Sequence, residues 1–300
     1  MTTLYWNNIC LLSMLEEQYL SSLNSNSIEI EYFGLGRKMS LLKKIQSEKI
    51  NNKSNWDIII STDTDVFQDN RLISKENNLI DLKNFYSISD NKYIQELIHP
   101  NGIFMPFIII PLVIIYNKNL LNKKDIPTSF FELTHLKYKN KFVFGGLHNS
   151  AGKSFLKSIL FKYGEKNTLK ILSNSVKTSM PAAAFKMVHS GQLPLAIVPT
   201  IFSNRSEYNH LSTIWPEEGA ISIPSYICIK KDVSKKTIEY VKNNITCLNF
   251  QEELVKRGSI IPTHKNVNNS FFTNSCKLFN PSWKFLNSLD HDYFYKLISL

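Results

Sequence analysis

The segment from Gly145 to Ser154 carries the clearest candidate chemistry in the sequence. Its last three residues resemble the end of a phosphate-binding loop, but that loop needs a glycine with four residues between it and Gly152. That position is Leu147, so nucleoside triphosphate hydrolysis is not favoured. What remains is a polar turn between a strand and a helix, whose N-terminus suits an anion or a polar group. Simple capping of that helix by Asn149 or Ser150 is an equally open interpretation, and one turn can do both.

Two further polar turns follow predicted strands near the N-terminus. Gly34-Leu35-Gly36 precedes a helix, but a dinucleotide-binding fingerprint would need glycine at Met39. Ser61-Thr62-Asp63 ends a third strand. Each turn by itself is an ordinary loop. Because ligands of open α/β sheets bind beyond the carboxyl ends of strands, the turns together form a candidate ligand site.

Signals for catalysis, metals and cofactors are weak. None of the seven histidines forms a zinc-binding pair, and no serine lies in a nucleophile-elbow motif. The four cysteines lack C-x-x-C spacing, and Cys10, Cys228 and Cys247 lie in apolar stretches where we expect small hydrophobic side chains. We therefore predict no catalytic residue, no metal site and no cofactor. An enzyme recruited from the fold would need a reactive residue such as His148 or Lys153.

These turns are positioned by alternating strands and helices. Residues 4–6, 28–33 and 56–60 read as strands, separated by helical faces at 11–23 and 39–49. This β-α-β-α-β order predicts a parallel sheet with helices on both faces. One or two central strands are expected at 103–116. A second α/β unit follows, with strands at 141–144 and 193–199 and helices at 155–163 and from Pro181 to Gly191. Further helices are expected beyond 220. A polar loop is expected at 200–209.

Composition and charge limit the classes of partner. The chain has 300 residues and a net charge of +10, but its lysines occur as short scattered pairs, so we predict no nucleic-acid binding. The longest apolar run, 103–116, is too short to cross a bilayer, and no signal peptide is recognisable at the N-terminus. We expect a monomer. It would be extracellular or periplasmic, with or without a lipid anchor, if a signal has been trimmed, and cytoplasmic if the sequence is complete.

An ordered set of segments resembles type II solute-binding proteins of ABC transporters, in the branch that binds ferric iron or aminoethylphosphonate. The resemblance runs from about Leu4 to about Pro262. The segments are Trp56–Ser61, Ile114–Lys118, Pro127–Leu133, Lys137–Lys141, Ser190–Gln192 and Trp215–Gly219.

This resemblance implies an α/β fold of two lobes, each a mixed sheet flanked by helices, with a cleft between them. Lobe 1 would comprise 1–115 and 222–300, and lobe 2 would comprise 116–221. The implied function is capture of a small polar or anionic solute by hinge closure, with ABC permease subunits as partners. The implied ligand-binding residues are Asn7, Asn8, Gly34, Gly36, Ser61, Thr62, His148, Asn149, Ser150, Ala151, Gly152 and Thr200.

Two departures from the family pattern keep alternatives open. Ferric-binding members use paired tyrosines where this chain has Thr200-Ile201-Phe202-Ser203, and Tyr208 stands without a second tyrosine beside it. Tyrosinate iron binding is therefore not favoured. The unrecognised export signal leaves a cytoplasmic ligand sensor or regulatory subunit as the main alternative to transport, with a recruited enzyme behind it.

Overall fold

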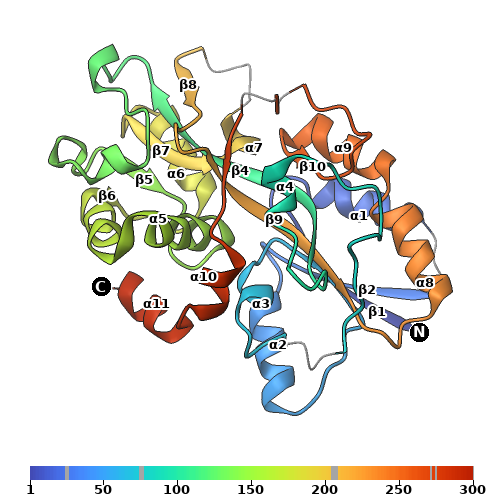
Figure 1. Cartoon of the computed structure of the whole chain (residues 1–300). Coiled ribbons are helices and arrows are strands. Elements are labelled where there is room, and N and C mark those ends of the chain that lie inside the picture. The colour runs from blue at the N-terminus through green and yellow to red at the C-terminus, as the bar shows by residue number, and fades with distance from the viewer. Residues whose placement is uncertain (24–26, 74–77, 204–208, 271, 274–275, 300) are drawn as a thin grey trace. The chain divides into compact units, whose positions relative to one another are not determined.

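The computed structural model describes residues 1–23, 27–73, 78–203, 209–270, 272–273 and 276–299 (Figure 1). The chain forms two compact units. Unit 1 comprises Met1–Ile109, Pro224–Phe271 and Ser282–Asn287. Unit 2 comprises Ile110–Ile223, Phe272–Pro281 and Ser288–Leu300.

Strands and helices alternate along most of the chain. The strands are β1 (Thr2–Asn7), β2 (Ile28–Phe33), β3 (Ile58–Ser61), β4 (Met105–Asn117), β5 (Phe142–Phe144), β6 (Ser175–Val176), β7 (Leu195–Pro199), β8 (Leu211–Ile214), β9 (Ala220–Ile229), β10 (Ile261–Pro262) and β11 (Leu278–Phe279). The α-helices are α1 (Ser13–Ser22), α2 (Leu41–Ile50), α3 (Asp65–Gln68), α4 (Lys92–Gln95), α5 (Ser150–Asn174), α6 (Pro181–His189), α7 (Thr200–Ser203), α8 (Lys235–Tyr240), α9 (Leu248–Gly258), α10 (Trp283–Ser288) and α11 (His291–Ile298). Short segments of other helix types are η2 (Lys123–Asp125), η3 (Phe131–Thr134), η4 (Leu136–Tyr138) and the π-helical η5 (Val241–Ile245).

Unit 1 is built on a mixed sheet in the order β2-β1-β3-β9. β1 runs parallel to both β2 and β3, so the three strands end at the same edge. The later half of β9 is antiparallel to β3, and β10 is antiparallel to β4. The parallel part confirms the β-α-β-α-β order predicted from the sequence.

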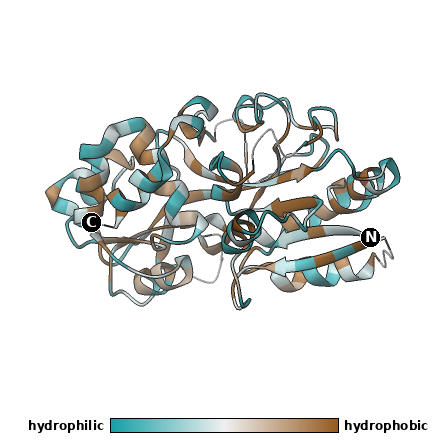
Figure 2. Cartoon of the chain, turned by 90° about the horizontal axis from the view of Figure 1, so that it is seen from below, coloured by the Kyte–Doolittle hydropathy of each residue, from teal (hydrophilic) through white to brown (hydrophobic). Residues whose placement is uncertain are grey.

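Alternate side chains of β1 pack on opposite faces of this sheet. Tyr5 lies in a buried cluster with residues of α2, α3 and α10, including Ile45 and Phe67. On the other face the ring of Trp6 lies 6.1 Å from that of Phe250 in α9, which in turn stacks at 3.9 Å on Tyr19 of α1. Burial of both faces explains why the inner strand β3 is a continuous apolar run, whereas β2 alternates apolar and charged residues. Figure 2 shows hydrophobic segments on the strands and mixed ones on the helices.

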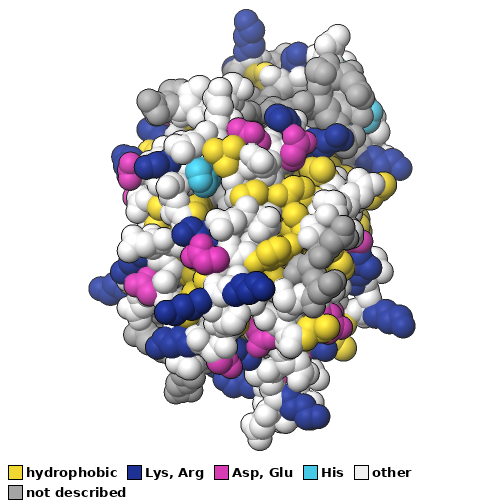
Figure 3. Space-filling view, turned by 90° about the vertical axis from the view of Figure 1, so that its right-hand side faces the viewer, with side chains coloured by type: hydrophobic (Ala, Val, Ile, Leu, Met, Phe, Trp, Pro, Cys, Tyr) yellow, Lys and Arg dark blue, Asp and Glu magenta, His cyan; other side chains and the backbone are white. Residues whose placement is uncertain are grey.

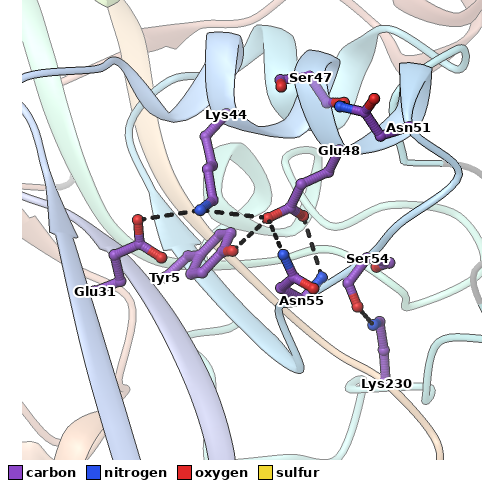
Figure 4. Close-up of polar contacts among 9 residues, drawn as sticks. All are labelled: Tyr5, Glu31, Lys44, Ser47, Glu48, Asn51, Ser54, Asn55 and Lys230. Carbon is purple, nitrogen blue, oxygen red and sulfur yellow. Dashed lines mark hydrogen bonds and ion pairs between the residues drawn. The ribbon is translucent and has the colours of Figure 1, made fainter.

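A buried carboxylate fastens α2 to the sheet (Figure 4). Glu48 is 6% exposed and accepts hydrogen bonds from the Tyr5 hydroxyl at 2.5 Å and from the Asn55 backbone and side chain at 3.2 and 3.3 Å. Lys44 lies 3.7 Å from Glu48 and 3.4 Å from Glu31. Burial, followed by the hydrogen bond to Glu48, raises the pKa of Tyr5 well above its usual value. The phenol therefore stays a donor throughout the physiological range.

Unit 2 is built on a second set of strands in the order β4-β7-β5-β6. β5 is parallel to β7 and β6, whereas the later half of β4 is antiparallel to β7 and to β8. One face of the sheet packs on Phe185 of α6 and Phe202 of α7. On the α5 side, Phe155 lies 5.2 Å from Phe144 of β5 and 5.6 Å from Phe130.

The apolar run at 103–116, for which one or two central strands were predicted, forms one strand, β4, although it contains Pro106 and Pro111. Other elements differ from their sequence-based description. The expected polar loop at 200–209 begins as helix α7, and residues 204–208 with Tyr208 lie outside the described part. Of the cysteines in apolar stretches, Cys228 is buried in β9, Cys247 is half-buried, and Cys10 is exposed in the turn between β1 and α1.

The C-terminal segment divides between the units. The sequence-based boundaries placed all of 222–300 in one lobe, whereas 272–281 and 288–300 group with unit 2. Three contacts explain this: β11 pairs with the first residues of β9, the Tyr293 hydroxyl donates to Glu165 of α5 at 2.7 Å, and Lys157 lies 5.7 Å above the Phe294 ring. α10 instead belongs to unit 1, where the Trp283 ring nitrogen donates to the Leu97 carbonyl at 3.0 Å.

Candidate functional site

In unit 1, polar residues gather where β1 and β3 end. The Asn7 side-chain amide donates to the Thr62 hydroxyl at 3.3 Å, which links the two strand ends. Ser61 is fully buried, and its hydroxyl accepts from the Asp63 backbone N–H at 2.9 Å. The parallel register of β1 with β3 brings these residues together, as expected from the sheet edge.

Asn8 is the most buried polar side chain in the turn after β1, with 8% exposure. Its backbone N–H donates to the Phe33 carbonyl at 2.8 Å, and its side-chain nitrogen donates to Glu17. Glu17 also pairs with Arg37 from the turn after β2. Asn8 is therefore held by both neighbouring segments.

Two glycines follow β2, and glycine is favoured at each position for a different structural reason. Gly34 has φ +126°, and a Cβ there would lie 3.2 Å from the Asn8 carbonyl oxygen, so the close approach to Asn8 favours glycine. Gly36 has φ +82° in a turn closed by the Arg37 N–H and the Gly34 carbonyl at 3.2 Å. A positive φ at the third position of such a turn favours glycine. Gly36 thus shapes the turn that carries Arg37.

A buried carboxyl group supports the turn after β1, which carries Asn8. Glu16 in α1 is 1% exposed and accepts from the Ile9 backbone N–H at 2.8 Å. Burial raises its pKa to about 8, against the lowering effect of that hydrogen bond. Glu16 and Glu17 give no signal in the sequence, because an amphipathic pattern does not reveal that these consecutive carboxyl groups contact the turn before the helix.

In unit 2, the candidate turn between β5 and α5 is a capped helix N-terminus. The Asn149 side-chain oxygen accepts from the Gly152 N–H at 3.0 Å, and its nitrogen donates to the Gly145 carbonyl and to the Ser179 carbonyl, the latter at 3.3 Å. The capping interpretation is confirmed at Asn149. Ser150 is the first residue of α5, and the next residue, Ala151, is buried, with 7% of its surface exposed.

Glycine is required here by packing. A Cβ at Gly152 would lie 1.5 Å from the Gly146 carbonyl oxygen, and one at Gly146 would lie 2.4 Å from that of Ser179. The turn is therefore folded tightly on itself and on the segment before α6. His148 is exposed and lies outside this packed part of the turn.

Thr200 lies at the same edge of unit 2 as this turn. β5 and β7 are parallel, with Phe144 opposite Ile197, so Gly145 and Thr200 both follow the carboxyl ends of neighbouring strands. Thr200 is fully buried and begins α7, where its carbonyl accepts from the Ser203 hydroxyl at 3.1 Å. The predicted residues thus form one group in each unit. That they bind a ligand remains a prediction.

Within the described ranges, no group of three or more His, Cys, Asp or Glu side chains is placed to hold a metal ion. In the same ranges, no helix has the length and apolar character needed to cross a membrane. On the face drawn in Figure 3, Lys and Arg side chains are scattered among acidic and uncharged ones, in keeping with the scattered lysine pairs of the sequence.

Known structures share this fold over nearly the whole chain. A ferric binding protein from Campylobacter jejuni has a TM-score of 0.74 and 16% identity, covering 100% of this chain and 98% of that one. Iron-bound HitA from Pseudomonas aeruginosa gives 0.75 and 13%, with 100% and 99% covered. A Trichodesmium protein (IdiA, FutA) in complex with iron and citrate gives 0.70 and 16%, with 99% and 98% covered. The TM-scores and the coverage show that the chain has the two-lobed α/β fold, as the sequence predicted.

Sequence comparison gives the family. A comparison with curated proteins finds no match. The family model described as bacterial extracellular solute-binding protein matches residues 53–289, well over half of the chain. That range includes Ser61–Thr62 and all of the unit 2 candidate residues. The chain therefore belongs to the bacterial extracellular solute-binding proteins, and its function is that of a substrate-binding subunit of an ABC transporter.

Proposed function

We propose that this protein captures a small polar or anionic solute with the two groups of strand-end residues and presents it to an ABC permease. The observation that carries the proposal is that each unit gathers its polar turns at the carboxyl edge of parallel strands. In unit 1 these are the turns at Asn7–Asn8 and Ser61–Thr62, and in unit 2 they are the turn at 145–152 and Thr200. Ligands of open α/β sheets bind at such edges.

The proposed preference for an anion comes from unit 2. The α5 N-terminus lies at the carboxyl edge, where the helix dipole contributes a partial positive charge. The Asn149 side chain accepts from the Gly152 N–H, one of the first four N–H groups of the helix, and the N–H groups of Ser150 and Ala151 would bind the oxyanion. The net charge of +10 would also favour the approach of anions.

Ferric iron is not the cargo that we propose, although several structural neighbours bind it. The residues after β7 are Thr200-Ile201-Phe202-Ser203, which form α7 and supply no phenolate. No cluster of three acidic, histidine or cysteine side chains suited to a metal occurs in the described part of the chain. An organic or phosphate-like solute suits the capped helix end better than a bare metal ion does.

We further propose that the protein is a monomer, acts outside the cytoplasm and catalyses no reaction. The proposal that the protein catalyses no reaction is supported by the polar side chains of the candidate turns. Ser61, Thr62 and Asn149 are engaged in hydrogen bonds that shape the turns, as expected of a binding site. His148→Ala and Lys153→Met test for a recruited enzyme.

The central experiment is a binding screen on the purified protein by thermal shift, followed by calorimetry. Phosphate esters, phosphonates, polyamines, thiamine-like compounds and metals form the panel. We expect an anionic compound to bind, and Asn149→Ala to weaken it at least tenfold. Asn91→Ala, which removes the equivalent cap from α4 in unit 1, is the matched control and should leave binding unchanged. A panel without any binder would overturn the proposal.

A further inference from the structure

Most of the positive charge of the chain lies in one stretch of unit 2. Residues 135–177 contain nine lysines and a single acidic residue, Glu165, so this stretch carries +8 of the net charge of +10. Lys153 and Lys157 are buried in the first half of α5. The other seven lysines are exposed: Lys137, Lys139, Lys141, Lys162, Lys166, Lys170 and Lys177. This stretch therefore exposes far more positive than negative charge.

Two parts of the stretch lie side by side. The Asn174 side chain, at the end of α5, donates to the His135 carbonyl at 3.2 Å. Further back along the helix, the ring of Tyr163 lies 5.1 Å from that of Phe131. The segment 131–141 thus runs along the second half of α5, and the exposed side chains of the two parts border one surface.

Four lysines of this surface have no acidic partner. Lys166 and Lys170 are four residues apart, so they share one side of α5, and both are exposed. Lys139 and Lys141 come from the neighbouring segment and are also exposed. Within the part of the chain that the structure describes, none of the four forms an ion pair. We call these four lysines the basic patch.

Two carboxylates of the same region are engaged by other groups. Glu132 accepts from the N–H and the hydroxyl of Thr128, both at 2.9 Å, and lies 4.0 Å from Lys137. Glu165 accepts from the Tyr293 hydroxyl at 2.7 Å. Glu132 therefore offsets the charge of Lys137, which we leave out of the basic patch, and the four lysines of the patch can meet an external anion.

Apolar side chains project beside the basic patch. Leu136 is 79% exposed, and Phe131 is 41% exposed. Protein interfaces are depleted of lysine and enriched in arginine, and residues 135–177 contain no arginine, so this surface does not resemble a site for another protein. Lysines beside exposed leucine and aromatic groups suit the surface of an anionic bilayer, because the ammonium groups meet the lipid headgroups while the apolar groups enter the acyl boundary.

We propose that unit 2 docks on the surface of an anionic phospholipid bilayer through the basic patch together with Phe131 and Leu136. Lys139 and Lys141 precede β5, whereas the candidate turn at 145–152 follows the carboxyl end of that strand. Docking would therefore use the opposite edge of the unit 2 sheet from the candidate turn. The inference is independent of the proposed function.

The test is co-sedimentation of the whole protein with lipid vesicles. Vesicles of phosphatidylglycerol and phosphatidylcholine provide the anionic surface, and vesicles of phosphatidylcholine alone provide the comparison. We expect binding to the anionic vesicles only. Binding should weaken as salt is added, because attraction to the headgroups is screened beyond about 10 Å at roughly 0.1 M ionic strength.

A pair of double variants locates the electrostatic contact. Each lysine near an anionic bilayer strengthens partitioning about fivefold, so Lys166→Gln combined with Lys170→Gln should weaken it about 25-fold. The matched control is Lys235→Gln combined with Lys236→Gln, which removes the same charge from exposed positions of α8 in unit 1. The control should bind the vesicles as the wild type does.

A second pair of variants tests the apolar contact. Leu136→Ser should weaken binding to anionic vesicles roughly fivefold, because it removes a side chain that enters the acyl boundary. Ile50→Ser is the matched control, since Ile50 is 82% exposed at the end of α2 in unit 1. All four variants alter exposed side chains, and circular dichroism would verify that each one is folded.

Three outcomes would overturn the proposal. The first is a wild type that does not sediment with anionic vesicles, including the case in which double-stranded DNA retains the protein through the same lysines. The second is equal weakening by the two double-lysine variants, because net charge alone would then explain the binding. The third is wild-type binding by Leu136→Ser, since entry of apolar side chains into the bilayer is part of the proposal.

Discussion

The carboxyl group of Glu16 should make the stability of unit 1 depend on pH. Its pKa is about 8 in the folded protein, because burial disfavours the charged form, against 4.5 for an exposed carboxyl group. The folded state therefore keeps a proton that the unfolded state releases. The stabilisation from this difference is fully present below about pH 4.5 and is lost as the pH rises to about 8. Glu16→Gln should remove this dependence, because glutamine is neutral and can still accept from the Ile9 N–H.

The magnitude follows from the two pKa values. Between pH 6 and pH 8 the contribution of Glu16 to the free energy of unfolding should fall by roughly 2 kcal/mol. For a unit of this size, 1 kcal/mol corresponds to about 2–4 °C in Tm. The wild type should therefore lose about 4–8 °C relative to Glu16→Gln over this range.

The assay is thermal unfolding of both proteins at pH 6, 7 and 8 at constant ionic strength, followed by circular dichroism. Comparing the variants at each pH cancels the titration of all other groups. Glu29→Gln, at an exposed position of β2, serves as the control and should follow the wild type. A Tm difference between wild type and Glu16→Gln that stays constant from pH 6 to pH 8 would refute the reasoning.

Three further predictions concern the packing of each unit. Tyr5→Phe removes the hydroxyl that donates to Glu48 and should cost about 1–3 kcal/mol, measured by denaturant unfolding. Gly152→Ala should destabilise unit 2 by several kcal/mol, because its Cβ would clash with the Gly146 carbonyl; a stable variant would show that the turn can move. Glu218→Ala deletes the acceptor for the Phe130 N–H at 2.8 Å and the Tyr163 hydroxyl at 2.6 Å, so unfolding should become easier by about 2 kcal/mol, measured by chemical denaturation.

Much of the fold could be predicted from local sequence patterns. Strands such as 28–33 and 195–199 are short apolar or alternating runs, and Pro181 and Asn149 mark helix starts by local geometry and capping. The helix at Thr200 was missed because four residues are too few for a periodic pattern. Pro106 and Pro111 also left the number of strands in 103–116 uncertain.

The location of the candidate site could be predicted from the sequence, but the hydrogen bonds made by its side chains could not. The turns after strands could be located, because they combine glycine and small polar residues. The partners of Asn8 could not, since Glu17 lies on a helix whose rotation depends on the packing of Tyr19 against Phe250. Orientation within a site is thus set by residues far apart in sequence.

The division of β4 and β9 between the units has a consequence for the order of folding. β3 obtains its neighbour on one side only from residues 226–229, and β10, which pairs with β4, comes later still. A nascent chain that has emerged up to Ile109 therefore lacks strands that complete the sheet of unit 1. Unit 2 is interrupted in the same way until β11 is made. Folding intermediates should consequently expose the edge of β3 until late in synthesis. We therefore expect chaperones that bind unpaired strand edges to interact with this protein while it folds.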